Sequence, residues 1–593
     1  ADQQIRSVAE LVRINPGVSA GQGEGHRDQI TIRGNNSTAD FFIDGLRDDV
    51  QYYRSFYNID RVEVHKGPNA MIFGRGGGGG LLNRVTKGPV ASETLLAGTG
   101  SIDTFGSFYA AADGNVPVSG SGALRVNAFY EDLNNHRDAF SGERYAVNPV
   151  IGAELGSGIK LQLGYEYVKD QRVVDRGIPS AFAGTLQNPA GPVRGFRDTF
   201  FGIRGVNETD FEAHVATFRG EASLAENLKF SVHALYGDYD KVYENVFPAG
   251  GVAGTPAAPT VLIEAYRDPT ERTTFIAQSN LVWEVETGGI GHTILAGVEL
   301  TDQDSYNERI NGFFNTANIA AAASRRVTVP LADPVVIPRP TFIAGPTGNS
   351  NRAVDSTVKQ YSAYFQDQLA LGESVDLILG VRYDRFENRV TNRFNGVEAK
   401  RIDDLWSPRA GLVVKPMRDA SVYVSYSRSF LPQSGDQFVS FDANAANLKP
   451  EKFDNYLVFP GQITSRWQTA LGLSSTKARI TEATTAAPAG RRVAQVPRTQ
   501  LSLWNRYDVT DSIGAGVGIY HQSSSFATIS NATRLPGYTR IDAALFFRLT
   551  DRIDAQVNLE NLTGERYFPN AHNDFNISTG APVNARFTIN ARF

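Results

Sequence analysis

Cysteine is absent from the 593-residue chain, and so are long apolar runs. Without cysteine the protein has neither a disulfide framework nor a thiolate metal site. No stretch approaches the ~20 apolar residues that a membrane-spanning helix needs. The mean hydropathy of −0.26 is that of an ordinary water-soluble chain. These absences exclude a small disulfide-stapled protein and a helical membrane protein.

An excess of positive charge is also absent. The chain has 58 Lys and Arg against 63 Asp and Glu, a net charge of −5, and no basic domain stands out. We therefore expect no nucleic-acid partner. The 8 histidines are scattered without metal-ligand spacing, and no His-Glu-x-x-His motif occurs. We expect no enzyme, no protein-bound metal and no resident cofactor.

What the chain does have is a glycine-rich stretch between two short strand patterns. Residues 61–66 read Arg-Val-Glu-Val-His-Lys, which predicts a strand that ends at Gly67-Pro68. Five glycines follow at 76–80, and residues 81–86 resume a strand pattern. Five glycines cannot hold a regular element, so we expect a tight, mobile or closely packed path. A phosphate-binding loop is disfavoured because Leu81-Leu82 follows where Lys-Ser/Thr would be needed.

This stretch resembles the plug domain of TonB-dependent outer-membrane receptors. The matching pattern is Arg-Val-Glu-Val-x-Lys-Gly-Pro, then Phe-Gly, the glycine run and Asn-Arg-Val-Thr-Lys. Upstream, 30–34 (Ile-Thr-Ile-Arg-Gly) and 41–46 (Phe-Phe-Ile-Asp-Gly-Leu) fit the same family, in the right order. The glycine-rich form looks most like the ferric catecholate siderophore branch. The resemblance implies a receptor that binds ferric siderophores and imports them with energy from the TonB-ExbB-ExbD complex.

After residue 93 the pattern changes to alternating segments of about ten residues, which is typical of transmembrane barrels. The clearest predicted strands are 123–131, 160–168, 230–236, 275–283, 361–369, 375–383, 422–426, 501–507, 514–520, 541–547, 555–559 and 585–593. Short turns alternate with long loops, the latter near 172–209, 241–263, 305–352 and 430–452. Tyr and Phe, 23 and 35 in number, can supply the aromatic girdles of such a barrel.

The predicted fold is an all-β transmembrane barrel of about 20–22 antiparallel strands, with an N-terminal α+β plug domain in its lumen. We assign residues 1–90 to the plug and 91–593 to the barrel. The strand pattern yields about 20 strands where the family has 22, and the shortfall falls near residue 457. Either two strands are truly absent, which keeps the even number that a closed antiparallel barrel requires, or they are omitted from the given sequence.

Within the plug, residues 7–14 have helical spacing, and 18–28, 35–40 and 47–58 read as loops. A signal peptide is absent or already removed, and the short TonB-binding box of the family does not precede the helix. The protein is expected in the bacterial outer membrane, in contact with lipid and lipopolysaccharide, as a monomer.

The loops of the plug carry the candidate ligand-binding residues. A mixture of aromatic and cationic side chains suits an anionic, aromatic ligand. The candidates are Arg27, Asn36, Arg47, Tyr52, Tyr53, Arg54 and Tyr57. The iron would arrive already chelated, so no protein metal ligand is expected.

The resemblance also implies two plug cations, Arg33 and Lys66, that pair with two barrel glutamates and hold the plug. One glutamate would follow Tyr456, where Leu457 stands, and the other would lie on a missing strand. A plug cation without a carboxylate would be costly inside the barrel, so other acidic groups or water must serve.

Two alternatives remain open from the sequence. One is a receptor on the same scaffold for hydroxamate siderophores or another scarce nutrient. The other is a secreted all-β adhesin or hydrolase built as a soluble propeller or solenoid.

Overall fold

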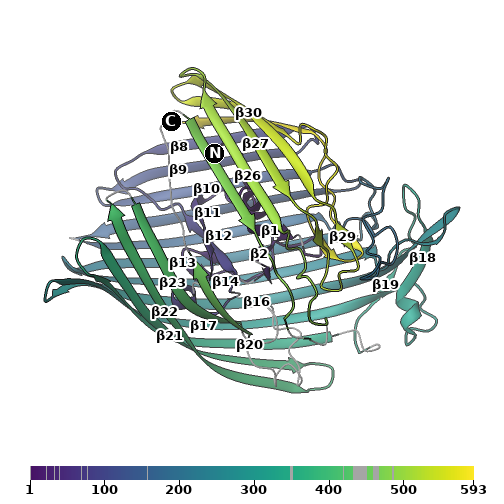
Figure 1. Cartoon of the computed structure of the whole chain (residues 1–593), viewed down its shortest axis with the longest axis horizontal. Coiled ribbons are helices and arrows are strands. Elements are labelled where there is room, and N and C mark those ends of the chain that lie inside the picture. Colours follow the sequence, from purple (N-terminus) through teal and green to yellow (C-terminus); the bar gives the residue numbers. More distant parts are fainter. Residues whose placement is uncertain are drawn as a thin grey trace.

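A computed structural model shows a long-stranded barrel around a small N-terminal domain (Figure 1). It describes residues 2–593 except 22, 33, 39, 68–69, 77, 157, 347–351, 418–419, 432–450, 458–466, 482 and 484–486. No helix in this described part of the chain is long and apolar enough to cross a membrane.

Consecutive strands pair antiparallel around the barrel, and the last strand pairs with the first to close it. The wall strands of the described residues are β8 (Leu95–Asp103), β9 (Phe108–Ser119), β10 (Gly122–Asn134), β11 (Ser141–Leu155), β12 (Ile159–Val173), β13 (Glu208–Ala225), β14 (Leu228–Pro248), β16 (Ala258–Thr287), β17 (Ile290–Phe313), β20 (Arg352–Ala370), β21 (Val375–Asn392), β22 (Glu398–Met417), β23 (Ala420–Leu431), β24 (Glu451–Leu457), β25 (Trp467–Ser475), β26 (Thr499–Asp508), β27 (Ile513–Gln522), β30 (Tyr538–Thr550), β31 (Ile553–Glu560) and β34 (Asn584–Arg592). All twelve predicted strands lie within these elements, save that the last runs one residue past β34 to Phe593. The predicted barrel is therefore confirmed.

Two of the predicted outer loops are wrong in part. Residues 241–263 are largely strand and 305–313 belong to β17, because β14, β16 and β17 run on past the loop boundary that their polarity suggested. Most of the described residues after 313 in the other predicted loop are not in strands. Three short strands extend this side of the sheet: β15 (Ala253–Thr255), β18 (Arg326–Pro330) and β19 (Thr341–Ile343). A 3-10 helix, η1 (Ala322–Arg325), precedes β18. The predicted loop at 172–209 separates β12 from β13 as expected, and most of 430–452 lies outside the described residues.

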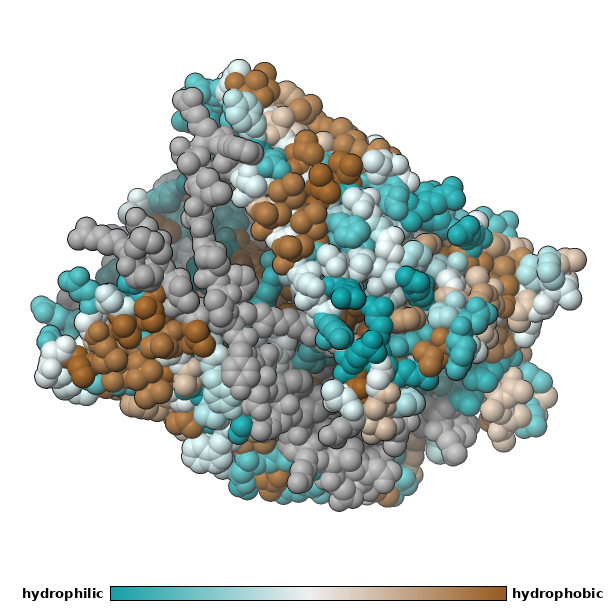
Figure 2. All heavy atoms as spheres, viewed as in Figure 1, coloured by the Kyte–Doolittle hydropathy of each residue, from teal (hydrophilic) through white to brown (hydrophobic). Residues whose placement is uncertain are grey.

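The outer face of the wall carries the apolar half of the alternation. Large exposed side chains such as Leu163, Val298 and Leu412 stand on this face. Aromatic residues join them, including Tyr130, Tyr165 and Trp406. Figure 2 shows such side chains gathered in brown over the strands at its top and lower left. Because hydrocarbon cannot satisfy backbone polar groups, a closed sheet with an apolar exterior is the β-structure that can span a bilayer.

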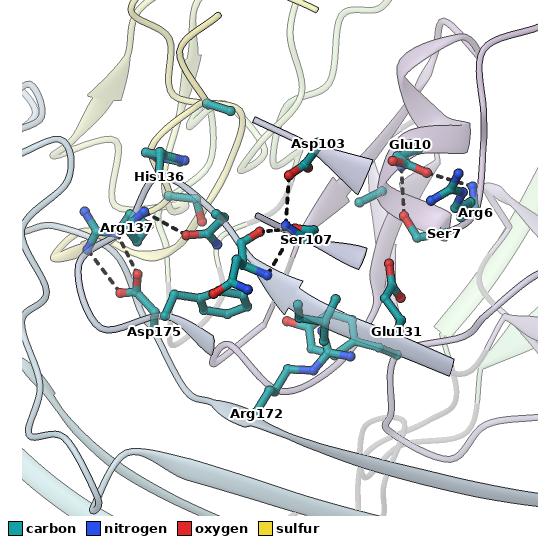
Figure 3. Close-up of a pocket in the computed structure, with 18 of the residues that line it drawn as sticks. Arg6, Ser7, Glu10, Asp103, Ser107, Glu131, His136, Arg137, Arg172 and Asp175 are labelled. Atoms are coloured by element: carbon teal, nitrogen blue, oxygen red, sulfur yellow. Dashed lines mark hydrogen bonds and ion pairs between the residues drawn. The ribbon is translucent and has the colours of Figure 1, made fainter. Parts of the chain in front are cut away.

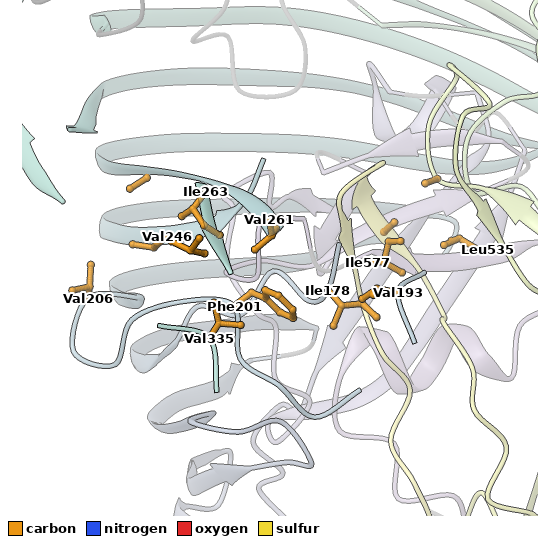
Figure 4. Close-up of a cluster of buried hydrophobic side chains, with 14 residues drawn as sticks. Ile178, Val193, Phe201, Val206, Val246, Val261, Ile263, Val335, Leu535 and Ile577 are labelled. Atoms are coloured by element: carbon orange, nitrogen blue, oxygen red, sulfur yellow. The ribbon is translucent and has the colours of Figure 1, made fainter. Parts of the chain in front are cut away.

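The outer loops on one side of the barrel have a hydrophobic core of their own (Figure 4). Ile178 and Val206 come from the β12–β13 connection, Val261 from β16, and Ile577 from the β31–β34 connection. Backbone bonds between Ile178 and Ile577 tie two of these loops directly. The loop core also includes β28 (Ser525–Phe526) with β29 (Arg534–Leu535), and β32 (Ala571–Asn573) with β33 (Asn576–Ile577).

The plug lies inside the barrel and consists of two small sheets and two short helices. Helix α1 (Val8–Arg13) begins at Ser7, whose Oγ accepts from the Glu10 amide. One sheet holds β1 (Val18–Gly21), β2 (Gln29–Ile32) and β3 (Asn35–Ser37); the other, in the order β5-β4-β7-β6, holds β4 (Phe41–Ile43), β5 (Leu46–Arg47), β6 (Ile59–Lys66) and β7 (Gly80–Thr86), and α2 (Ala70–Phe73) follows β6. The predicted helix and the strands at 61–66 and 81–86 are confirmed. The loop predictions at 18–28 and 35–40 are wrong where β1 and β3 form.

Close approach to neighbouring backbones explains two glycines of the run. A Cβ on Gly79 would lie 2.1 Å from the Ile32 carbonyl oxygen, and one on Gly80 would lie 2.2 Å from that of His65. Gly80 also has a φ of +139°. These glycines let β7 start directly against two neighbouring backbones. Of the tight, mobile or closely packed paths that the sequence allows, the structure shows the closely packed one.

We expect Leu163→Arg to destabilise the barrel by up to about 2–4 kcal/mol, because Leu163 stands on the apolar outer face of β12. Gln162, its neighbour, faces inward towards Gly88. Urea unfolding of both variants in lipid vesicles checks this, with Gln162→Arg as the matched control. Equal effects of the two substitutions would contradict the assigned faces of β12.

Candidate functional site

A cavity of about 400 Å³ lies between the plug and the wall, at the end of the barrel that carries the long loops (Figure 3). The plug contributes Arg6, Glu10, Gly25, Asp28 and Tyr53 to it. Wall strands and outer loops supply the remaining lining, which includes Asp103, Tyr109, Glu131, His136, Arg137, Arg144, Arg172, Asp175, Tyr567, Thr579 and Arg586. Loops from both ends of the barrel sequence therefore meet the plug in one place.

The cavity is rich in guanidinium groups, each held in position by a neighbour. Arg137 Nε donates to Asp175 at 2.6 Å, and Arg586 Nη2 lies 3.2 Å from Glu10 Oε1. Arg144 pairs with Glu131 on the adjacent strand. Paired guanidiniums keep their planes and spare N–H groups fixed, which suits recognition of a planar anionic ligand.

Tyr53 and Arg172 form a contact between the plug and the wall in this cavity. The Arg172 guanidinium lies 4.2 Å from the centre of the Tyr53 ring, within cation–π distance. Asp170 accepts from Arg172 Nε at 2.7 Å and orients it. An aromatic ring and a guanidinium are thus presented side by side from two parts of the chain.

Asp28 is a buried carboxyl group of the cavity wall. It is 3 % exposed, and one carboxylate oxygen accepts from the Arg54 amide at 2.7 Å. Burial raises the pKa of Asp28 to about 6, against the opposing effect of Arg54. The charge of the cavity therefore changes in the mildly acidic range.

A close backbone approach fixes the plug loop that carries Gly25. Gly25 has a φ of +84°, and a Cβ there would lie 2.7 Å from the Asp175 carbonyl oxygen. Only glycine suits both conditions, so the plug loop can touch the outer loop that supplies Asp175.

The neighbouring Glu24 points into a second polar cluster. Tyr243 donates to Glu24 at 2.6 Å, Tyr266 donates to its other oxygen, and His572 of the outer loop lies 3.6 Å away. Burial would raise the pKa of Glu24, but the bond with His26 and the charge of Arg176 outweigh it and hold the pKa well below its usual range. Burial lowers the pKa of His572 to about 4, so this imidazole is neutral at pH 7 and Arg176 supplies the positive charge.

Of the seven predicted ligand residues, all of which the structure describes, only Tyr53 lines the cavity. Arg27 lies half-buried in the same plug loop as Gly25, and its Nε has no hydrogen-bond partner among the described residues. Asn36 is exposed on β3 and accepts from Gln29. Arg47 is turned into the plug, where it donates to the Phe73 and Arg75 carbonyl oxygens.

The other three predicted residues are used inside the plug or against the wall. Arg54 is 0 % exposed and donates to Asp48 at 2.8 Å, so no ligand can touch it in this arrangement. Tyr52 donates to the same carboxylate and stacks on Phe211 of β13 at 4.8 Å. Tyr57 is buried and donates to Glu166 of β12 at 2.7 Å.

The coupling role of Arg33 and Lys66 stays a prediction. Arg33 lies outside the described residues, and Lys66 Nζ donates to the Pro16 carbonyl oxygen within the plug. Other residues of the plug form ion pairs of both polarities with the wall: Asp2–Arg506, Glu10–Arg586, Arg13–Glu560, Asp49–Arg272 and Lys87–Asp113.

Asp49 makes a deeply buried contact between plug and wall. Arg75 donates to one of its oxygens at 2.7 Å, and Arg272 of β16 to the other at 3.3 Å. All three side chains are at most 4 % exposed. The two guanidiniums hold the pKa of Asp49 below its usual value although burial would raise it.

The sequence missed the arginines of the wall. Arg144 and Arg172 lie on β11 and β12, where neighbouring aromatic residues such as Tyr145 face outward. The parity of these strands could have placed Arg144 inside the lumen. One serine motif was also overlooked: residues 17–21 read Gly-Val-Ser-Ala-Gly. Ser19 lies on β1 and donates to the Gln495 carbonyl oxygen, so it is not on the strand-to-helix turn that a nucleophile needs.

The fold and this interface define an outer-membrane receptor: a lipid-embedded barrel, a plug, and a loop-roofed cavity between them. The plug-domain model of TonB-dependent receptors matches residues 1–81, and the model of the TonB-dependent receptor-like β-barrel matches residues 148–458 and 459–562. The chain therefore belongs to the TonB-dependent receptor family of the outer membrane. The barrel match divides at 458/459, which is where the sequence predicts missing strands.

Several relatives are similar over nearly the whole chain. A probable TonB-dependent siderophore receptor, PiuA of Acinetobacter baumannii, is 24% identical over 96% of this chain and 87% of its own length. The catecholate siderophore receptor Fiu of Escherichia coli K12 is 24% identical over 100% of this chain and 89% of its own length. The metal-pseudopaline receptor CntO of Pseudomonas aeruginosa PAO1 is 26% identical over 90% of this chain and 80% of its own length.

Solved structures agree on the fold. The crystal structure of PiuA has a TM-score of 0.89 at 21% identity and covers 100% of this chain and 95% of PiuA. The closed form of E. coli Fiu has a TM-score of 0.84 at 22% identity and covers 100% of this chain and 95% of the Fiu chain. The soluble propeller or solenoid alternative is thereby excluded.

Substitution of Asp49 tests the plug–wall contact. We expect Asp49→Ala to destabilise the plug by about 3–5 kcal/mol, because it removes the buried carboxylate that the Arg75 and Arg272 guanidiniums share. Asp60→Ala is the matched control: Asp60 is exposed on β6 beside Arg61, so its loss should cost below about 1 kcal/mol. Urea unfolding followed by a spin label on a cysteine introduced in the plug measures both, and equal costs would contradict the assignment.

Proposed function

We propose that this protein binds a ferric siderophore at its outer side and imports it across the outer membrane. The observation that carries the proposal is the cavity in which Tyr53 of the plug and Arg172 of the wall lie side by side beneath the outer loops. A ligand seated there would touch both the plug and the barrel. Binding could therefore change how the plug is held, as an import receptor requires.

The chemistry of the cavity favours a catecholate ligand. Ferric catecholates are anionic and aromatic, so guanidinium N–H groups can bind their oxygens and aromatic rings can stack on theirs. Iron inside such a chelate needs no protein ligand, and no group of three or more potential metal ligands occurs among the described residues. The protein would act as a receptor and transporter with no resident cofactor.

The proposal includes the TonB-ExbB-ExbD complex as the source of energy. The family is defined by dependence on TonB, and the plug is held by ion pairs that must be disturbed before a solute can pass. We further propose that the protein works as a monomer among lipid and lipopolysaccharide. TonB-dependent uptake by cells that express it, compared with cells lacking TonB, tests the energy source.

A second candidate on the same scaffold is a receptor for a different metal chelate. The similarity to CntO, which is named for metal-pseudopaline, favours keeping it. Binding of ferric catecholates, ferric hydroxamates and metal-pseudopaline to the purified protein separates the two. The catecholate proposal fails if only a chelate of another class binds.

Truncation of Tyr53 tests the site itself. We expect Tyr53→Ala to weaken binding of the ferric catecholate by about 2–30-fold, which corresponds to about 0.5–2 kcal/mol of stacking and cation–π contact. Tyr130→Ala is the control, because Tyr130 faces outward from the wall and is 40 % exposed. Titration of the purified variants measures both affinities, and a Tyr53→Ala affinity equal to that of the parent would remove this cavity as the site.

The pH dependence of binding provides a further test. Below its raised pKa of about 6, Asp28 is neutral and does not repel an anion in the cavity. Affinity for the anionic chelate should therefore fall as the pH rises through 6, beyond any change due to the ligand's own titration. Asp28→Asn should remove this extra fall, because asparagine can still accept from the Arg54 amide. Parallel pH profiles for the two proteins would show that Asp28 does not contribute.

A further inference from the structure

Arginines gather on the outer connections above β25, β26 and β27. Three come from the β25–β26 connection, one directly precedes β26 and one lies on β29 of the β27–β30 connection. This arginine patch consists of Arg479, Arg491, Arg492, Arg498 and Arg534. Arg479, Arg498 and Arg534 are exposed, and the other two are half-buried.

The two connections that carry the patch are fixed to each other by Asn531. This buried side chain accepts from the Arg492 amide and donates to the Arg492 carbonyl oxygen, both at 2.9 Å. Arg491 donates to the carbonyl oxygen of Ser530, and the Arg492 guanidinium lies 5.3 Å from the centre of the Phe526 ring. The patch is therefore a fixed arrangement of arginines from two segments of the chain.

The hydrogen bonds of the patch leave its charges unbalanced. Each side-chain acceptor within the described part of the chain is neutral: the Gly490 carbonyl oxygen for Arg479, the Ser530 carbonyl oxygen for Arg491 and the Ser524 hydroxyl for Arg534. A guanidinium has five N–H donors, so most of them stay available to a ligand.

The patch also brings like charges together. Arg479 and Arg492 lie directly opposite each other on paired backbones, an arrangement that costs free energy when the two charges have the same sign. Burial and the charges of Arg479, Arg534 and Arg498 lower the pKa of Arg492. A bound anion would relieve this repulsion, so the patch favours a ligand that carries negative charge.

The height of the patch places it at the outer edge of the apolar band of the wall. The alternation of exposed and half-buried residues on β25 continues from the lipid-facing Leu473 up to Arg479. On β26, the exposed Tyr507 lies next to the turn at the other end of the barrel, and Arg498 lies nine residues above it. A tilted strand rises by roughly 2.5 Å per residue and the band is about 25 Å tall, so Arg498 lies near its outer edge.

The far side of the barrel carries carboxylates at a similar height. Glu212, Asp240 and Glu271 lie opposite one another on β13, β14 and β16. Asp240 and Glu271 are exposed, four residues above the outward-facing Tyr236 and Phe275. Figure 1 shows β14 and β16 behind the lumen and β26 and β27 in front of it. An anionic headgroup is repelled by the first side and attracted by the second.

We propose that the arginine patch binds the phosphate groups of lipopolysaccharide, so that this lipid docks on the β25–β27 side of the receptor. The outer leaflet of the outer membrane presents phosphates at this height, and the guanidinium fork matches phosphate oxygens in pairs. The lipid is the one already proposed as a partner, so the inference rests on that proposal and adds its site.

The docked lipid would also stabilise the outer loops. The β27–β30 connection, which carries Arg534, contributes Ala527 and Leu535 to the hydrophobic core that these loops share. Neutralising the arginines beside it removes a repulsion between the two connections that Asn531 joins.

Binding of lipid to the purified protein in detergent tests the patch. The probe is a deep-rough lipopolysaccharide with both lipid A phosphates, compared with the same lipid after dephosphorylation and with inorganic pyrophosphate. The test variants are Arg498→Glu, which changes an exposed side chain, and Arg479→Gln with Arg492→Gln. The matched control is Arg389→Gln with Arg393→Gln, because these exposed arginines at the outer end of β21 are paired with Glu398 and Asp355.

We expect both patch variants to bind the phosphorylated lipid about tenfold or more weakly than the parent, because charge-assisted hydrogen bonds are lost. The control should stay within about twofold, and dephosphorylation should remove the advantage of the parent. Parent-like binding by both patch variants would overturn the inference, and so would an equal loss in the control. Pyrophosphate that binds the parent as tightly as the lipid does would replace the lipid site by a site for free phosphate.

A heat-modifiable gel shift checks that each variant keeps a closed barrel, and ferric catecholate binding is measured in parallel. We expect the patch variants to keep the parent affinity for the chelate, because no patch residue lines the cavity that contains Tyr53. Chelate binding that falls in the patch variants while lipid binding stays at the parent level would assign the arginines to the ligand site and overturn the inference. If the parent binds the lipid but no ferric chelate, the proposed import function fails and the lipid site stands.

Discussion

Unpaired backbone groups cannot remain in hydrocarbon, and this constraint governs the whole molecule. The wall satisfies it by pairing each strand with its neighbour and closing β34 onto β8. A closed wall of so many strands surrounds a lumen too wide for its own side chains to fill. The plug occupies this wide lumen. Because the surface of the plug is polar, the inner face of the wall carries charged groups. Strand alternation, the plug and the buried ion pairs are thus consequences of one solvent requirement.

The plug is held unevenly, and this unevenness gives the site its position. Where plug and wall are both apolar, as around Leu46 and Phe211, they exclude water and fit closely. Where arginines and carboxylates face each other, close packing of plug and wall would leave buried polar groups without hydrogen-bond partners, so cavities remain. The cavity that contains Tyr53 and Arg172 lies on that polar side. The candidate ligand site therefore lies in the polar part of the interface.

The sequence predicted the barrel well because period-two alternation is set by lipid on one side and water on the other. The predicted segments 160–168 and 361–369 lie within β12 and β20, although both strands extend further at one end. It predicted the upper parts of β14, β16 and β17 as loops, because beyond the membrane both faces are polar and the alternation disappears. The plug motif gave the right domain, and the roles of its residues were harder to infer. Arg54 looks like a ligand-binding residue in a loop, yet it is wholly buried against Asp48. Burial of this kind is decided by contacts between segments far apart in the chain, which no local pattern contains. The charged partners of the plug were missed for the same reason.

The hydrophobic core shared by the outer loops has a consequence for how such receptors diverge. Ile178 and Ile577 belong to two different connections and Val261 to the start of β16, yet all three are buried in one cluster. Replacing one connection with that of a relative would expose apolar surface on the segments that remain. New ligand preferences on this side must therefore arise by concerted change across several segments, or by point changes that leave the shared core intact. Grafting between receptors would need to transfer all the outer segments that share this core together.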